Sequence, residues 1–265
     1  MKNKVVLITG ASSGIGLETA RYLSEDGYKV IGVSRSYPKQ SFEFDYFLCD
    51  ITDESQVIFT KNQIEKKYGK IDCLVNSAGM GISGAIENTP LEEVKQIYQV
   101  NVFGQFLMTK HMISLLRNSS QPKIINISSI ASEIALPFQA FYSMTKASID
   151  AFTKALAVEV KPFGIQVGAI LPGDIKTDFT KHRVQPPVIK ENLYEERIKK
   201  SIGRMEKDEQ NGMSPLVIAK KIHRLIRRKH IPLSSTAGIS YKTIRILKKV
   251  LPEKLVYWLV GKLYG

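Results

Sequence analysis

The sequence has few residues that could bind a metal or form a disulfide. Among 265 residues there are only two cysteines, Cys49 and Cys73, and four histidines. Each cysteine lies in an apolar stretch typical of a buried strand, and neither belongs to a CxxC or Cys/His spacing. We therefore expect two buried thiols and no metal site. The histidines, which lack ligand spacing with acids or cysteines, are His111, His182, His223 and His230.

Long hydrophobic runs are also missing. The longest one near the C-terminus spans residues 255–260, whereas a membrane-spanning helix needs about 20 apolar residues. Residues 1–4 lead directly into the apolar run 5–8, which is too short and too early for the apolar region of a signal peptide. We therefore expect a cytoplasmic protein without a transmembrane helix.

Acidic residues are scarce only in the last third of the chain. Residues 1–180 contain 18 basic and 18 acidic residues, whereas residues 181–265 contain 20 and 7, which accounts for the whole net charge of +13. The first two thirds therefore form a neutral body. The basic tail points to an acidic partner such as a membrane surface, a nucleic acid or an anionic substrate. Because no nucleic-acid motif accompanies the charge, we expect no nucleic-acid partner.

Apolar β-branched runs alternate with longer segments of helical period, as in βαβ units around a parallel sheet buried on both faces. The predicted strands are 4–9, 29–33, 46–49, 71–77, 123–128 and 165–171. The predicted helices are 15–26, 53–68, 91–118, 141–160, 215–229 and 243–263, the last broken at Pro252. The sequence thus predicts an α/β fold, in which one doubly wound domain has a parallel sheet of six to seven strands and helices on both faces.

The pattern loosens after residue 171. Residues 190–210 alternate in charge and contain few apolar residues, which predicts a mobile helix or flap. We expect the whole chain, residues 1–265, to form one domain. Within it, 178–215 would be a substrate-loop region and 216–265 a basic amphipathic C-terminal extension.

A glycine-rich turn, TGASSGIG over residues 9–16, follows the first predicted strand. Glycines let the backbone turn tightly and approach a pyrophosphate, whose charge then meets free N–H groups at the helix N-terminus. The spacing is GxxxGxG rather than the GxGxxG of the dinucleotide fingerprint. We interpret the turn as a cofactor site, the alternative being tight packing alone. Its members are Gly10, Ser12, Ser13, Gly14, Ile15 and Gly16.

The second predicted strand ends in Val33, Ser34 and Arg35. A site specific for NAD places an acid near this position to bind the adenosine ribose, whereas an arginine favours the 2′-phosphate of NADP. Ser34 stands where the acid would be, and Arg35 follows it. The pair therefore favours NADP(H), with a merely solvated arginine as the alternative.

Tyr142 and Lys146 are four residues apart in a predicted helix, so the phenol and the ammonium lie on one helix face. A nearby cation stabilises phenolate and lowers a tyrosine pKa from about 10 toward the range of a general acid or base. Ser129 ends the preceding strand, where its hydroxyl is placed to meet the same substrate oxygen. The three residues predict proton transfer at an oxygen atom.

Together these motifs resemble those of the short-chain dehydrogenases/reductases of the single-domain type, over about residues 4–178. The ordered motifs are TGxxxGIG at 9–16, Asp50 after the third strand, NSAG at 76–79, Asn101, Ser129, the YxxxK pair, and Pro172-Gly173 followed by Thr177. The resemblance implies a Rossmann-type fold. It also implies hydride transfer between a nicotinamide cofactor and a carbonyl carbon.

The family's roles, carried over to this sequence, make Tyr142 the general acid or base and Ser129 the group that polarises the substrate oxygen. Tyr142 and Lys146 would both contact the cofactor, and Lys146 would bind the nicotinamide ribose and lower the pKa of Tyr142. Asn101 would hold a water of a proton relay, or alternatively would only bond helix backbone. The cofactor contacts implied in the same way are Asp50 and Ile51 at the adenine, Asn76, Ala78 and Gly79 along the cofactor, Pro172 and Gly173, and Ile175 and Thr177 at the carboxamide and phosphates.

The sequence departs from the family pattern at Ser77, which replaces the more usual second Asn of NNAG, and at the C-terminus, which lacks the usual last strand with a Gly-Gly pair. The tail is similar instead to that of the hydroxysteroid and retinol dehydrogenase branch or of related bacterial members, which leaves the seventh strand unplaced. Family members are commonly dimers or tetramers. The resemblance therefore implies a homo-oligomer built through the helices 91–118 and 141–160.

Candidate pocket residues around the YxxxK helix are mainly apolar. They predict a bulky, steroid-like or lipid-like ketone or secondary alcohol as substrate, the alternative being that they pack only against one another. These residues are Met80, Ile82, Ile134, Phe138, Phe141 and Phe179.

The basic tail has two interpretations, because its charges flank the apolar run 255–260. One is a patch that contacts an anionic membrane peripherally. The other, which we favour, is a solvated helix face whose apolar side packs on the body or on another subunit.

The sequence therefore predicts an NADP(H)-dependent oxidoreductase that interconverts a ketone or aldehyde and an alcohol, with Tyr142 as general acid/base. An epimerase or dehydratase is disfavoured, because residues 180–265 are too few for the larger substrate domain of those relatives. The competing hypothesis is a non-catalytic NADP-binding or membrane-associated module on the same fold.

Overall fold

The computed structural model of the chain describes residues 3–179, 183–184 and 193–265. Its strands are β1 (Val5–Thr9), β2 (Lys29–Ser34), β3 (Asp45–Leu48), β4 (Cys73–Asn76), β5 (Lys123–Ile127), β6 (Gln166–Leu171) and β7 (Ser234–Thr236). They form one sheet in the order β3-β2-β1-β4-β5-β6-β7, and neighbouring strands are parallel. The predicted parallel sheet is confirmed, with seven strands among the described residues.

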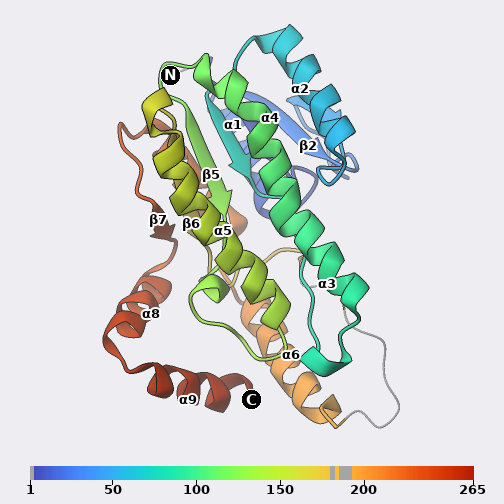
Figure 1. The fold of residues 1–265 in the computed structure, drawn as a ribbon, viewed down its shortest axis with the longest axis vertical. Helices are drawn as coiled ribbons and strands as arrows, with labels where there is room; N and C mark the ends of the chain where they lie inside the picture. Colours follow the sequence, from blue (N-terminus) through green and yellow to red (C-terminus); the bar gives the residue numbers. More distant parts are fainter. Residues whose placement is uncertain (1–2, 180–182, 185–192) are drawn as a thin grey trace.

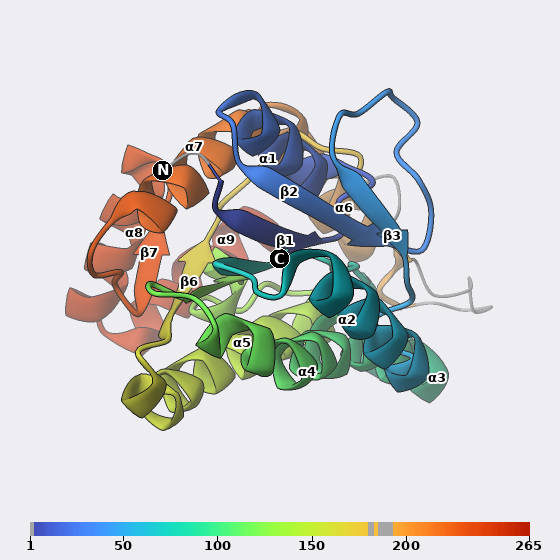
Figure 2. The same cartoon turned by 90° about the horizontal axis from the view of Figure 1, so that it is seen from above.

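Helices cover both faces of this sheet (Figure 1). They are α1 (Gly14–Glu25), α2 (Glu54–Tyr68), α3 (Leu91–Tyr98), α4 (Gln105–Arg117), α5 (Ala140–Glu159), α6 (Glu195–Gln210), α7 (Pro215–Arg227), α8 (Ile239–Val250) and α9 (Glu253–Tyr264). Helices α1 and α7 lie on one face, and α2, α4 and α5 lie on the other (Figure 2). The chain changes direction between β1 and β4, which is where ligands bind in doubly wound sheets.

Alternate residues of the central strands fill two separate cores. Val5 and Leu7 of β1 join the core beneath α2, α4 and α5. Val6 and Ile8 join the core beneath α1 and α7. Because all four side chains are at most 3% exposed, the strand is buried on both faces, as its unbroken apolar sequence predicts. The two cysteines are unpaired and buried, one in each core.

The long helix predicted over 91–118 is interrupted. Between α3 and α4 the residues Gln99–Gly104 form a π-helical turn, which contains Asn101. A π-turn inserts an extra residue and changes the face that the following residues present. The predicted strand 71–77 is also shorter than expected. Its first residue leaves the ladder because the N–H of Ile71 donates to the carbonyl of Leu115 at 3.2 Å.

Besides α7, the C-terminal third supplies the last edge of the sheet and the three helices α6, α8 and α9. β7 pairs with β6, α6 packs against α9, and α8 and α9 are separated at Pro252 as predicted. These three helices lie beyond the carboxyl ends of the strands (Figure 1). In the predicted 178–215 region, residues 195–210 are helical, and 180–182 and 185–192 lie outside the described residues. No helix in the described part of the chain has the length and apolar character to span a membrane.

Candidate active site

A cavity of about 830 Å³ lies at the carboxyl ends of the strands. Its walls come from the glycine-rich turn, from the segments that follow β2 to β6, and from α5, α6, α8 and α9. Large clefts of this kind are the usual location of ligand sites. All of the predicted site residues line the cavity except Asn76 and Asn101.

Close backbone approaches explain the glycines of the turn. Gly10 and Gly14 have φ angles of +68° and +54°, which strain residues with a side chain. A Cβ atom on Gly16 would lie 2.2 Å from the carbonyl oxygen of Gly10. The turn therefore leaves its backbone uncovered toward the cavity, as a pyrophosphate site requires.

Hydrogen bonds attach this turn to the neighbouring strand. The Thr9 hydroxyl accepts from the backbone N–H groups of Ser77 and Ala78 at 3.0 and 3.1 Å. Ser13 is the N-cap of α1, and its side chain makes no capping hydrogen bond. Because the first N–H groups of a helix lack partners within the helix, the start of α1 fits the phosphates of a dinucleotide.

The segments after β2 and β3 form the opposite end of the cavity. The Ser34 hydroxyl donates to the carbonyl of Ser36 at 2.6 Å and is also hydrogen-bonded to the hydroxyl of Tyr46. Arg35 is exposed beside them. The Asp50 carboxylate accepts from the N–H and hydroxyl of Thr52 at 2.9 and 2.8 Å, so it also stabilises its own turn. A guanidinium beside hydroxyl groups fits a phosphate ester.

Tyr142, Lys146 and Ser129 meet in the middle of the cavity. Tyr142 and Lys146 belong to α5, and Ser129 follows β5. The Ser129 hydroxyl is near enough to the Tyr142 phenol to stabilise its phenolate form, and it accepts from the N–H of Ala131 at 3.1 Å. The Lys146 ammonium donates to the carbonyl of Ile127 at 2.9 Å and lies 5.7 Å from the centroid of the Tyr142 ring. The helix spacing thus places the phenol, the ammonium and a hydroxyl around one space.

Burial sets the charge states of these groups. It raises the pKa of Tyr142 to about 12, against which the Ser129 hydroxyl has the smaller effect. It lowers the pKa of Lys146 to about 8. The expected lowering of the Tyr142 pKa by Lys146 is therefore not found. The free-energy cost of removing phenolate from water is larger than the stabilisation that neighbouring groups give it. At neutral pH Tyr142 keeps its proton.

Two predicted site residues lie outside the cavity wall. Asn76 is fully buried, and its amide donates to Asn126 at 2.9 Å and to Thr109 at 3.1 Å. It therefore joins β4, β5 and α4 rather than contacting the cavity. Asn101 is fully buried in the π-turn, where it accepts from the N–H of Met80 at 2.8 Å and donates to the carbonyl of Met80 at 3.0 Å.

These bonds are contacts of Asn76 that the sequence did not predict, and its cofactor contact stays a prediction. The sequence could not show them, because the partners of this amide come from other elements. The backbone that Asn101 bonds is that of Met80 in the loop after β4, not the helix backbone of the alternative interpretation, and its amide also donates to the hydroxyl of Thr145 at 3.1 Å.

The sequence missed the wall that α8 and α9 contribute. The ring of Tyr241 covers Gly173 so closely that a Cβ there would lie 2.1 Å from it. The Tyr241 hydroxyl donates to the Asp174 carboxylate at 2.5 Å. The amphipathic pattern of 243–263 indicated an apolar face, but no local signal says which element covers it. The remaining wall residues from these helices are Ile244, Leu247, Lys248, Leu251, Val256, Leu259, Val260, Leu263 and Tyr264.

Three of the six predicted pocket residues line the cavity, namely Met80, Ile134 and Phe179. Phe179 approaches Tyr142, with 5.8 Å between the ring centroids. The other three, Ile82, Phe138 and Phe141, are not part of the wall. Ile82 is 2% exposed and bridges to Val184.

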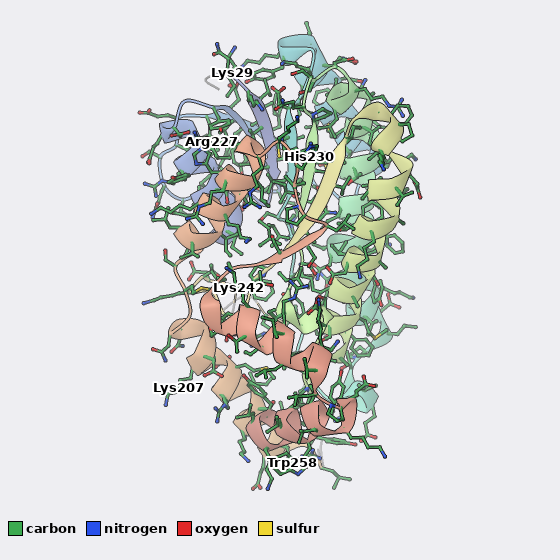
Figure 3. The ribbon with its side chains drawn as sticks, turned by 90° about the vertical axis from the view of Figure 1, so that its left-hand side faces the viewer. Lys29, Lys207, Arg227, His230, Lys242 and Trp258 are labelled. Atoms are coloured by element: carbon green, nitrogen blue, oxygen red, sulfur yellow. The ribbon has the colours of Figure 1, made fainter. Side chains whose placement is uncertain are left out.

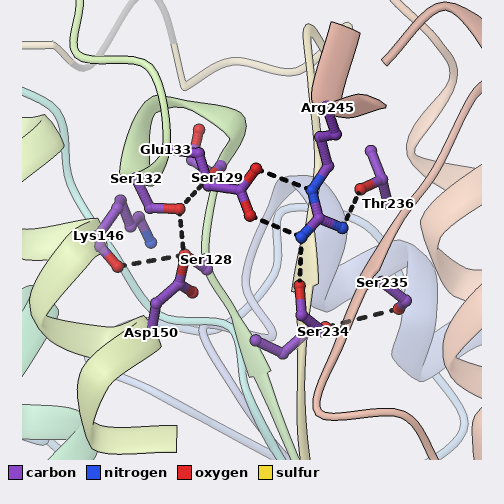
Figure 4. A network of polar contacts seen from close by, with 11 residues as sticks. Ser128, Ser129, Ser132, Glu133, Lys146, Asp150, Ser234, Ser235, Thr236 and Arg245 are labelled. Atoms are coloured by element: carbon purple, nitrogen blue, oxygen red, sulfur yellow. Dashed lines mark hydrogen bonds and ion pairs between the residues drawn. The ribbon is translucent and has the colours of Figure 1, made fainter. Parts of the chain in front are cut away.

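A polar network fixes α8 to the loop that carries Ser129 (Figure 4). The Arg245 guanidinium donates to the two carboxylate oxygens of Glu133 at 2.9 and 2.6 Å. It also donates to the hydroxyls of Thr236 at 2.8 Å and Ser234 at 2.9 Å. Because Tyr241 and Arg245 are one helical turn apart, both inner contacts of α8 reach loops of the candidate active site.

Comparison with known proteins assigns the family. The sequence profile of the short chain dehydrogenase family matches residues 4–187. The chain belongs to the short-chain dehydrogenases. A curated relative of this family, 3-ketodihydrosphingosine reductase of Bacteroides thetaiotaomicron, is 35% identical over 267 residues and covers 100% of this chain and 99% of the relative.

Solved structures of short-chain dehydrogenases agree with this assignment. The protein ElxO with NADP bound has a TM-score of 0.75 and 29% identity, covering 92% of this chain and 100% of ElxO. The 3-ketoacyl-(acyl-carrier-protein) reductase of Brucella melitensis in complex with NADH has a TM-score of 0.74 and 28% identity. The match covers 89% of this chain and 96% of the reductase. The chain is thus an oxidoreductase of a family that uses a nicotinamide cofactor.

Proposed function

We infer that this short-chain dehydrogenase uses NADP(H) to interconvert a ketone or aldehyde and an alcohol, with Tyr142 as general acid/base. The observation that carries this function is the meeting of Tyr142, Ser129 and Lys146 in the cavity that begins at the glycine-rich turn. The nicotinamide, when bound, supplies or accepts a hydride at the carbonyl carbon. The residues of the chain bind the oxygen and transfer the proton.

During reduction, the Ser129 hydroxyl would donate a hydrogen bond to the substrate oxygen. Tyr142 would give its proton to the same oxygen while the hydride reaches the carbon, so that full negative charge does not form on the oxygen. The pKa of about 12 keeps Tyr142 in the protonated form that this direction needs. Lys146 would bind the nicotinamide ribose. Asn101 would act through Met80 and Thr145, as a positioning residue.

The adenosine end of the cavity supports NADP(H) over NAD(H). Arg35 and the hydroxyl of Ser34 line it where an NAD-specific site has an acid. The solved relatives bind either form of the cofactor. The preference for NADP(H) therefore rests on the side chains of this chain.

The substrate we propose is bulky and apolar, either steroid-like or lipid-like. The walls contributed by α8 and α9 are mainly aliphatic, among them Leu247, Leu259 and Leu263. Apolar walls favour a ligand that gives up water-exposed hydrocarbon on binding. The name of the Bacteroides relative, a reductase of 3-ketodihydrosphingosine, agrees with a lipid ketone.

The wider expectations from the sequence form part of the proposal. We expect one domain over residues 1–265, a homo-oligomer, and a cytoplasmic location. A non-catalytic NADP-binding module on the same fold is the competing function. Tyr142, Ser129 and Lys146 are all present and adjacent, which favours the enzyme.

The test is oxidation of NADPH and NADH by purified protein with carbonyls that range from short polar aldehydes to steroid and long-chain lipid ketones. We expect turnover of the bulky apolar ketones with NADPH. Tyr142→Phe should lower that turnover by about 10²- to 10⁴-fold, the usual effect of general acid/base catalysis. NADPH binding, measured by cofactor fluorescence, should persist, because the glycine-rich turn and Arg35 are unchanged.

The matched control is Tyr68→Phe, since Tyr68 ends α2 outside the cavity wall. It should keep wild-type turnover. NADPH binding without turnover of any ketone would favour the non-catalytic module. Equal activity of Tyr142→Phe and wild type would contradict the mechanism.

A further inference from the structure

Helices α8 and α9 expose an unusual number of large apolar side chains. We call this surface the tail face and define it by Ile246, Leu247, Val250, Tyr257, Trp258 and Leu263. Val250 is 76% exposed, Ile246 64% and Trp258 58%. Large apolar side chains exposed together on a folded protein mark a candidate interaction site.

The tail face belongs to a firmly attached element. Tyr241 and Arg245, on the inner side of α8, bind Asp174 and Glu133. Val256 of α9 is 8% exposed and lines the cavity. The two helices therefore have an inner side that lines the active site and an outer side with Ile246, Val250, Tyr257 and Trp258, whereas Leu247 and Leu263 are exposed and also line the cavity. The outer side is available to a partner while the inner side stays in place.

The charge around the tail face is positive. Residues 239–265 contain six basic residues and one acidic residue, Glu253. Arg245 is paired with Glu133, whereas Lys242, Lys249 and Lys254 are exposed. Lys262 is also exposed, and its ammonium lies 5.7 Å from the Trp258 ring centroid. Figure 3 shows Trp258 on α9 at the end of the molecule remote from Lys29 and Arg227, and Lys242 on α8 about half-way between the two ends.

We propose that the tail face docks on the surface of an anionic lipid bilayer. Apolar and aromatic side chains framed by lysines are the composition of helices that lie in a membrane interface. Each basic residue near an anionic surface adds to the attraction. The apolar side chains enter the interface, and the lysines contact the lipid phosphates.

Charge decides between this partner and the alternatives. In a symmetric dimer through the tail face, the exposed lysines of one copy would face those of the other, because both copies use the same patch. A nucleic acid would neutralise the lysines but would leave the apolar side chains in water. An anionic bilayer satisfies both features of the surface.

Docking would also bring the cavity next to the source of its substrate. Leu247 and Leu263 are members of the tail face and of the cavity wall. A lipid ketone could then pass from the bilayer into the cavity along these helices. This step rests on the proposed function, whereas docking itself does not.

The test is flotation of the full-length protein with vesicles of phosphatidylcholine alone or mixed with phosphatidylglycerol, at low and high salt. We expect flotation with the anionic vesicles at low salt and loss at high salt. Trp258 is the only tryptophan, so its emission reports on the tail face. It should move to shorter wavelength when these vesicles are added.

The variant Lys242→Glu/Lys249→Glu should weaken binding by at least about 30-fold, from the loss of two lysines alone. Ile246→Ser/Val250→Ser should abolish the emission shift. The matched control is Lys66→Glu/Lys220→Glu, which makes the same charge change on exposed lysines of α2 and α7. It should bind like wild type.

Activity with a detergent-solubilised ketone separates the two proposals. The tail-face variants should keep it, because their substituted side chains are absent from the cavity wall. No flotation at low salt, or equal flotation of Lys242→Glu/Lys249→Glu and wild type, would overturn docking. A dimer that dissociates in Ile246→Ser/Val250→Ser would overturn it too, by assigning the face to a second copy.

Discussion

Lys146 has an ammonium group in the interior of the protein, where the residue is 5% exposed. Burial lowers its pKa to about 8, whereas an unfolded lysine titrates at about 10.4. Between these values the unfolded chain binds more protons than the folded one. The free energy of unfolding therefore rises with pH in this window, because the cost of burying a charge disappears as the proton leaves.

Lys146→Met removes this titration. The free energy of unfolding of wild type, relative to that of Lys146→Met, should increase by about 1 to 2 kcal/mol from about pH 8 to about pH 9.5. Urea unfolding at both pH values measures it. Lys154→Met, an exposed lysine of the same helix, should show no such change relative to wild type. A constant difference between wild type and Lys146→Met would contradict the depressed pKa.

Arg35 is the residue that should set cofactor preference. Arg35→Ala should raise KM for NADPH by about 10- to 100-fold, the value of a lost charge-assisted hydrogen bond. KM for NADH should change by less than about twofold, because NADH has no 2′-phosphate. Steady-state kinetics with both cofactors measure this. Lys39→Ala, nearby but outside the cavity wall, should leave both constants unchanged, and an equal rise for both cofactors would refute the assignment.

Contacts between residues that are close in the sequence could be predicted, whereas contacts between residues that are far apart in the sequence could not. Tyr142 and Lys146 could be paired from the sequence because helix geometry places positions four apart on one face. The burial of Asn76 could not be inferred, because its partners Asn126 and Thr109 come from other elements. The predicted lowering of the Tyr142 pKa was wrong for the same reason, because the desolvation that raises this pKa depends on the packing of the whole cavity.

At the scale of elements, the position of α8 depends on the ion pair between Arg245 and Glu133. Arg245 and Glu133 are 18% and 24% exposed at their side chains, so removing the arginine leaves a poorly hydrated carboxylate without its partner. Arg245→Met should lower the free energy of unfolding by about 1 to 3 kcal/mol. It should also raise KM for a bulky ketone, because α8 forms part of the cavity wall. Urea unfolding and steady-state kinetics provide the two measurements.

Two further variants make this prediction specific. Glu133→Gln/Arg245→Met should regain part of the lost stability, because the unpaired carboxylate is then gone. Arg224→Met, an exposed arginine of α7, should change neither quantity. If Arg245→Met were as stable as wild type, the ion pair would not fix α8.

The strands show why some elements can be read from sequence and others cannot. β1 is an unbroken run of apolar or β-branched residues, all of them buried, which is the pattern of a central parallel strand. β5 is also buried throughout, although it begins with Lys123 and contains Asn126. β7 is the three-residue strand Ser234–Thr236, with no apolar run to reveal it. It exists because the free edge of β6 needs hydrogen-bond partners. The π-turn at Gln99–Gly104 contains Asn101, whose partners Met80 and Thr145 come from other segments of the chain.

At the scale of the whole molecule, α4 and α5 have apolar side chains that this single chain does not cover. Phe106 of α4 is 43% exposed, and Met144 and Val158 of α5 are 49% and 74% exposed. These are the helices through which the family resemblance implies a homo-oligomer. Unlike the tail face, this surface lies beside the sheet (Figure 2), so a subunit interface here and a membrane contact on α8 and α9 are compatible.

Phe106→Asp should therefore shift the protein toward smaller species. A charge in place of an interface aromatic removes its buried area and adds a desolvation cost, so the dissociation constant should rise by at least about 30-fold. Sedimentation velocity over a range of protein concentrations measures this. Phe59→Asp is the matched control, because Phe59 is a 64% exposed aromatic on α2, outside the proposed interface. A wild type that sediments as a monomer, or the same shift in both variants, would show that α4 does not form the interface.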